Sequence, residues 1–212
     1  MKIITGFMLT MLLLAACAAP VSAPAETKPA PVPEKYELVL SEGVYEYDTQ
    51  DRYAAVGYYS DVFSAQILSG PTVEFPYEED IAFPDGSTIH DRGTPYSLYQ
   101  ARVTGVLKGE LKEGEEITLR RLGGYDEETG ELVLLQHDCL PQEGGEYLFL
   151  TLADDAGRYT VSAPYTVIPL QEDFASINTL EEKDRFENRE EALAVYREAA
   201  EHPKEFQQLN NQ

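Results

Sequence analysis

The chain has 212 residues, of which 16 are basic and 38 acidic, so its formal net charge at pH 7 is −22. Proteins that bind nucleic acid neutralise phosphates with lysine and arginine, and this balance argues against such a partner. An anionic membrane surface would repel the chain for the same reason. The acidity suits a soluble domain and allows a cationic partner.

The N-terminus combines a single lysine with a short apolar segment. Residues 1–16 read MKIITGFMLTMLLLAA, and their apolar run is shorter than the ~20 residues that span a bilayer. The length and the small-residue ending predict a signal peptide. The sequence Leu14-Ala15-Ala16-Cys17 that closes this segment resembles the lipobox of bacterial lipoproteins.

In the lipoprotein family, signal peptidase II recognises the lipobox and cleaves before the cysteine, whose thiol carries a diacylglyceryl group. The resemblance implies lipidation of Cys17 and an extracytoplasmic chain anchored to a bacterial membrane. Each buried methylene of such an anchor contributes about 0.8 kcal/mol, and two acyl chains hold where one does not. The alternative is an ordinary signal peptide followed by an incidental cysteine. Residues 17–35 are rich in proline and alanine, which predicts a disordered stalk.

Residues 36–175 have the alternation of a mainly β domain. Tyr99, Ala101, Val103 and Leu107 recur with the period of one strand face, and Gly105 predicts a bulge between them. A second run at 117–120 would complete a hairpin, and further strands are expected at 61–68, 131–135, 147–152, 158–163 and 165–170. Many short strands with turn signals predict a sandwich or a closed barrel.

Two segments depart from this pattern. Residues 71–95 contain four prolines and several turn signals, which predict a long ordered loop or a small extra hairpin, and such loops often carry function. Residues 176–212 are expected to form a C-terminal helical segment and tail. Asn188 and Glu191 mark the helix start, and Pro203 marks its end.

Three stretches together resemble the netrin and tissue-metalloproteinase-inhibitor family of domains. They are Ser60–Phe63, Val106–Gly109 and Gly145–Phe149, and the resemblance covers about residues 54–170. It implies a small closed or partly open OB-like β-barrel with a C-terminal α-helix. The animal inhibitors carry several disulfides and bind a protease zinc through an N-terminal cysteine. Cys17 would be lipid-modified and distant from the barrel, so the resemblance does not extend to protease inhibition.

The one suggestive chemical cluster is His137-Asp138-Cys139. A thiol, an imidazole and a carboxylate are the ingredients of a cysteine nucleophile. Successive residues of a strand point to opposite faces, so His137 and Cys139 could meet while Asp138 would turn away. The favoured interpretation is a buried thiol beside a surface histidine. A metal site joining His90-Asp91 to His137-Asp138 is a weaker hypothesis, and we expect no cofactor.

Acidic and aromatic clusters are also present. The acidic ones are Glu78-Glu79-Asp80, Asp126-Glu127-Glu128 and Asp154-Asp155, which we interpret as solvated turns, with calcium binding at the first or second as the alternative. A set of tyrosines favours a half-buried barrel wall over an exposed binding patch; it comprises Tyr58, Tyr59, Tyr96, Tyr99 and Tyr125.

The sequence therefore predicts a lipid-anchored, non-enzymatic binding or interaction module at the cell envelope. Its expected contacts are the membrane, through the lipid on Cys17, and an envelope protein or cationic partner. Two alternatives remain: an envelope hydrolase or thiol enzyme that uses Cys139 and His137, and the solute-binding component of a transporter.

Overall fold

The computed structural model describes residues 32–171, 177–181 and 185–206, and the protein is mainly β with a C-terminal helix, as predicted. The expected signal peptide, the lipobox and most of the expected stalk lie outside the described residues. No helix in the described part of the chain is long and apolar enough to cross a membrane.

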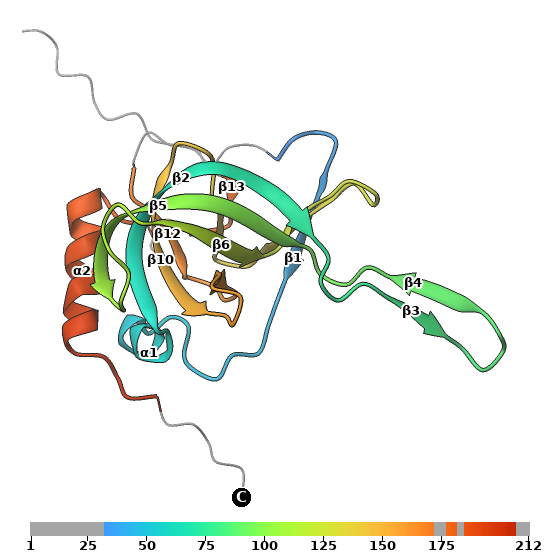
Figure 1. Ribbon diagram of the computed structural model, residues 1–212, viewed down its shortest axis with the longest axis horizontal. Coiled ribbons are helices and arrows are strands. Elements are labelled where there is room, and N and C mark those ends of the chain that lie inside the picture. The colour runs from blue at the N-terminus through green and yellow to red at the C-terminus, as the bar shows by residue number, and fades with distance from the viewer. Residues whose placement is uncertain (1–31, 172–176, 182–184, 207–212) are drawn as a thin grey trace, which may run out of the picture.

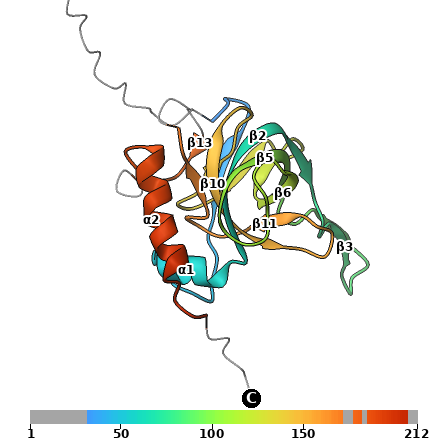
Figure 2. The same ribbon diagram turned by 60° about the vertical axis from the view of Figure 1, so that its left-hand side comes forward.

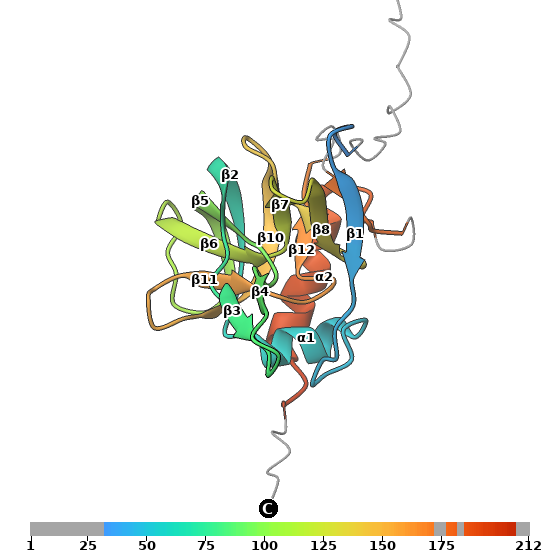
Figure 3. The ribbon, with the colours of Figure 1, turned by 90° about the vertical axis from the view of Figure 1, so that its right-hand side faces the viewer.

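The central element is a sheet whose strands form a ring (Figure 3). The ring strands are β2 (Asp61–Glu74), β5 (Tyr96–Lys108), β6 (Glu116–Leu122), β11 (Tyr159–Val161) and β10 (Glu146–Ala153). They are hydrogen-bonded in that order, and β10 returns to pair with β2. The β6–β11 pair is parallel, whereas the other neighbours in the ring are antiparallel.

Further short strands surround the ring. They are β12 (Val167–Pro169), which pairs with β10, a sheet of β1 (Glu37–Ser41), β8 (Glu131–Leu135) and β7 (Gly124–Asp126), and a pair of β9 (Cys139–Leu140) with β13 (Ile177–Asn178). The predicted strand over 131–135 is therefore confirmed as β8, but it lies outside the ring. β1 runs parallel to β8, a non-local pairing that no sequence pattern indicated.

The main core fills the interior of the ring, where Tyr99, Ala101 and Val103 are buried as their alternation predicted. The placement of Leu107 on that same face was wrong. The register of β5 against β2 shifts between Val103 and Gly105, and this bulge moves the following residues by one position. Val106 consequently packs against the interior cluster, and Leu107 packs against a second cluster outside the ring.

That second cluster lies between the ring and two helices, α1 (Arg52–Tyr58) and α2 (Arg189–Glu201), which Figure 2 shows along the outside of the ring. The Asn188 side chain accepts a hydrogen bond from the backbone N–H of Glu191, so the predicted helix start is confirmed. The seven-residue α1 was not predicted.

The stretches that suggested the family resemblance attach the helices to the ring. The Lys108 ammonium donates to the carbonyl oxygens of Val56 (2.6 Å) and Tyr59 (2.5 Å) at the end of α1. Gly109 has a φ of +106°, and a Cβ there would lie 2.0 Å from Oδ1 of Asp61, so only glycine fits. Lys108 and Gly109 therefore have a structural role in packing.

Glu146 attaches the second helix, α2, to the ring. Its carboxylate accepts hydrogen bonds from Arg189 at 3.0 and 3.1 Å and from the Thr104 hydroxyl at 2.6 Å. Burial favours a higher pKa for Glu146, but the hydrogen bonds from Arg189 and Thr104 outweigh it and lower the pKa. The glutamate thereby fixes α2 against β10 and β5.

Between β2 and β5 the chain leaves the ring as a hairpin of β3 (Glu79–Ala82) and β4 (Thr88–Asp91), which Figure 1 shows projecting away from the rest of the molecule. We call residues 76–91 the arm. The hairpin alternative for 71–95 is thus confirmed. Its turn is closed by a hydrogen bond from Gly86 N–H to the Phe83 carbonyl oxygen, with Gly86 at a φ of +86°.

Candidate functional site

The arm is the longest unbroken run of exposed residues in the described part of the chain. Every residue from 76 to 91 is exposed, including the apolar side chains of Tyr77, Ile81, Phe83 and Ile89. A two-stranded hairpin that buries no apolar face is only marginally stable in water. Exposed apolar side chains grouped on one element typically mark an interaction surface.

The two faces of the arm differ in charge. Ile81 lies opposite Ile89, and Glu79 lies opposite Asp91, so strand alternation places these four side chains on one face. Phe83 continues the same alternation towards the turn. We call this set the apolar face. Its two carboxylates face each other across the strands, and within the described residues neither has an ion-pair partner.

The opposite face of the arm contains its own cationic partner for the acids. His90 lies across from Asp80, with 2.8 Å between Nδ1 and the carboxylate, and its Nε2 is 2.8 Å from Glu78. The hydrogen bond to Asp80, supported by that to Glu78, raises the pKa of His90 above its usual value. A protonated His90 therefore pairs with both acids and offsets one of their two negative charges.

The root of the arm is held on one side by Arg120. Its Nε donates to Glu74 at 2.8 Å, and its guanidinium lies over the Tyr96 ring at 3.9 Å. Glu74 ends β2 and Tyr96 begins β5, so one arginine joins the two strands from which the arm emerges. Arg158 also contacts Glu74 at 3.4 Å and pairs with Asp154 at 2.8 Å.

Arg92 holds the other side. It lies over the Phe75 ring at 3.9 Å and pairs with Asp126 at 2.6 Å and Glu128 at 2.9 Å. Cation–π contacts and partly buried ion pairs of this kind restrict the rotation of the segment that carries them. The arm is therefore presented in a set direction although its own residues are exposed.

The predicted cluster His137-Asp138-Cys139 does not converge. The Cys139 side chain is fully buried in the ring interior. The His137 ring is stacked on Tyr165, with 5.0 Å between centroids, and Asp138 pairs with Arg121. The three side chains therefore have separate surroundings, and the thiol has no access to a substrate in this conformation.

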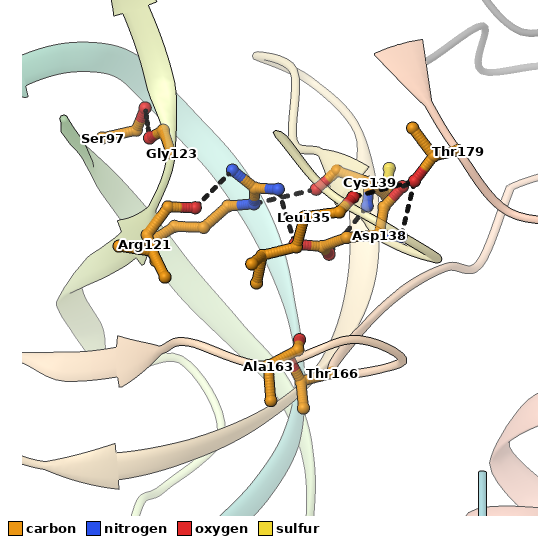
Figure 4. Close-up of polar contacts among 10 residues, drawn as sticks. Ser97, Arg121, Gly123, Leu135, Asp138, Cys139, Ala163, Thr166 and Thr179 are labelled. Atoms are coloured by element: carbon orange, nitrogen blue, oxygen red, sulfur yellow. Dashed lines mark hydrogen bonds and ion pairs between the residues drawn. The ribbon is translucent and has the colours of Figure 1, made fainter. Parts of the chain in front are cut away.

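Asp138 and Arg121 instead form a buried polar network (Figure 4). Nη2 of Arg121 lies 2.6 Å from Oδ2 of Asp138, and its Nε donates to the Cys139 carbonyl oxygen at 3.0 Å. Burial raises the pKa of Asp138, and the Arg121 guanidinium opposes that rise. The network connects β6 with β9, and we assign it to structure.

The remaining predicted clusters are distributed over the molecule. Asp126 and Asp154 are paired with arginines, and Glu127 contacts Lys35 and the Tyr36 hydroxyl. Among the tyrosines, Tyr59 and Tyr99 are buried in different clusters. The five tyrosines therefore form no common patch.

Sequence reasoning did not identify the arginines at the root of the arm. Arg120 is 46 residues from Glu74 in the sequence, and Arg92 is 34 residues from Asp126, so only the folded chain brings each pair together. The signal that was present is the run of residues 77–91, in which two alternating segments flank a Pro-Asp-Gly-Ser turn.

In the described part of the chain, no group of three or more histidine, cysteine or acidic side chains has a geometry that could hold a metal ion. His90 and His137, which the metal hypothesis combined, lie on the arm and beside β9. No protein-family model matches the sequence, and comparison with curated proteins finds no match.

Proposed function

We propose that the protein is a lipid-anchored extracytoplasmic interaction module whose arm contacts another protein of the cell envelope. The observation that carries the proposal is the arm itself. It places exposed apolar side chains at the end of a hairpin whose root is held by Arg92 and Arg120. Such preorganisation lowers the entropic cost of binding.

The order of the strands in the ring supports our proposal that the scaffold of the module is an OB-like barrel. An OB-fold is a partly open, five-stranded Greek-key barrel, and the order β2-β5-β6-β11-β10 with one parallel pair agrees with that architecture. OB-folds use the loop between their first two strands for binding. In this chain the arm occupies that connection, between β2 and β5.

The proposed location at a membrane rests on the sequence. The lipobox Leu14-Ala15-Ala16-Cys17 and the proline-rich segment after it favour a lipid anchor followed by a stalk. A module held at a membrane by its N-terminus can search for a neighbouring protein at high effective concentration.

Crosslinking in intact cells tests the function. The wild-type chain is compared with a variant in which residues 77–91 are replaced by a short glycine-containing turn. Since these residues are all exposed, the variant should keep the ring and its melting temperature. We expect one reproducible partner that the shortened chain loses. A partner captured equally well without the arm would contradict the proposal.

A further inference from the structure

From the charge pattern of the arm, we infer that the apolar face docks a partner segment that presents a basic side chain next to an apolar one. The inference rests on the proposed function and specifies its partner. Its starting point is the asymmetry between the two faces of the arm.

On the apolar face, Glu79 and Asp91 are directly opposed like charges, an arrangement that destabilises a strand pair. On the opposite face, His90 contacts both Asp80 and Glu78, so the acids of that face have a basic partner. Within the described residues, Glu79 and Asp91 have none. A cation placed between Glu79 and Asp91 would remove this repulsion. The unbalanced pair therefore indicates where a basic side chain of the partner would lie.

The neighbouring positions define the second requirement. Ile81 and Ile89 follow the acidic pair along the same face, and Phe83 lies beyond them. All three are exposed, at 38%, 56% and 41% respectively. Because side chains on one face of a strand recur every second residue, a matching extended segment would carry its basic and apolar residues two positions apart.

The overall charge selects among possible occupants. The arm contains five acidic residues and no lysine or arginine, and the whole chain is strongly acidic. A second copy of the chain would bring like charge against like charge, and an anionic lipid surface would do the same. A basic segment of another protein is the occupant whose charge is complementary.

The probe is a synthetic peptide in which lysine and isoleucine stand two positions apart with threonine between them, and binding is followed by fluorescence anisotropy with the chain carrying Cys17→Ser. The control peptide has glutamate in place of lysine. We expect the lysine peptide to bind, with an affinity that falls as salt rises. Absence of binding, or equal binding of the glutamate peptide, would overturn the inference.

Matched variants separate docking from general attraction to an acidic protein. Glu79→Gln with Asp91→Asn removes two charges from the apolar face, and Glu110→Gln with Glu113→Gln removes two from the exposed β5–β6 turn. The first pair should weaken binding roughly tenfold, and the second should leave it nearly unchanged. Equal weakening by both pairs would overturn the inference.

Apolar contact is tested by Ile81→Thr with Ile89→Thr, which keeps β-branched residues in the strands and should also weaken peptide binding. Arm-dependent dimerisation in sedimentation, or arm-dependent binding to anionic lipid vesicles, would assign the face to a different occupant and overturn the inference.

The cellular crosslinking separates this inference from the proposed function. A partner lost with the arm but kept by the Glu79→Gln, Asp91→Asn variant would contradict only the docking face. A partner kept without the arm would contradict the function as well.

Discussion

His90 is the side chain of the arm whose charge changes near neutral pH. Its pKa is raised by Asp80 and, to a lesser extent, by Glu78. Because the pKa in the folded arm exceeds the unfolded value near 6.5, the stabilisation is fully present below pH 6.5 and is lost as pH rises through the folded pKa.

An NMR titration of the His90 ring should therefore give a midpoint above 6.5, and Asp80→Asn should lower it. Glu110→Gln, which is remote from the arm, serves as the control. The same midpoint in the wild type and in Asp80→Asn would contradict the assigned contact.

Both side chains of the Arg121–Asp138 ion pair are buried. In Asp138→Ala the guanidinium would stay buried without its counter-charge, so we expect a loss of about 3–5 kcal/mol in the free energy of unfolding, measured in urea. Arg121→Met combined with Asp138→Leu should recover much of that loss, because no charge remains buried. A loss below about 1 kcal/mol, as for an exposed pair, would contradict the prediction.

Cys139 supplies a test of the thiol-enzyme alternative. Its side chain is fully buried in the ring interior, so alkylation at neutral pH should be slow in the folded chain and rapid in denaturant. The Cys17→Ser background makes mass spectrometry unambiguous. Rapid alkylation of the folded chain that is lost on His137→Ala would favour the enzyme instead.

At the scale of the elements, the arm depends on contacts at its root. Arg120→Met removes both the pair with Glu74 and the cation–π contact with Tyr96. Spin labels at Ser87→Cys on the arm and Lys112→Cys in the β5–β6 turn should then report a broader distance distribution than in the parent chain.

The matched control for that measurement is Arg102→Met. Arg102 on β5 forms an arginine–glutamate pair with Glu116 on β6 at 2.7 Å, away from the root, so this change removes an ion pair without touching the arm. Equal broadening in both variants would show that Arg120 has no special role in orienting the arm.

The elements also show what the sequence could predict. Strands β5 and β6 follow from alternation, β10 from a run that is apolar on both faces, and helix α2 from capping, all of which depend on neighbouring residues. The shift at Gly105 reversed the face of Leu107, because a bulge changes the phase of the alternation without changing its period. The parallel β1–β8 pair depends on tertiary packing, and local patterns carry no signal for it. The short α1 has a local signal, because the Asp51 side chain accepts hydrogen bonds from the N–H groups of Tyr53 and Ala54, but this seven-residue helix was not predicted.

For the candidate site, local patterns were less informative. The hairpin within 71–95 was foreseen as an alternative, but the arginine contacts that orient it were not. Conversely, the adjacency of His137, Asp138 and Cys139 suggested chemistry, and folding directs the three side chains to different surroundings. Sequence neighbours share a backbone but not an environment.

At the scale of the whole molecule, the proposed anchor would determine where the arm can act. In the proposed lipoprotein, Cys17→Ser should move the chain from the detergent phase to the aqueous phase in a partition experiment, because no acyl chain would be attached. The serine substitution leaves the described residues untouched and should not change the melting temperature. Continued partitioning into detergent would contradict the lipid anchor.

β1, the first strand of the described chain, has a mechanical consequence. It pairs with β8 through five residues in parallel register, and Lys35 and Tyr36 just before it contact Glu127. Tension arriving from the N-terminal side along the strand would load these pairs together in shear rather than peel them apart singly. A protein tethered at this end could therefore bear a pulling force through β8 while its ring and arm keep their geometry.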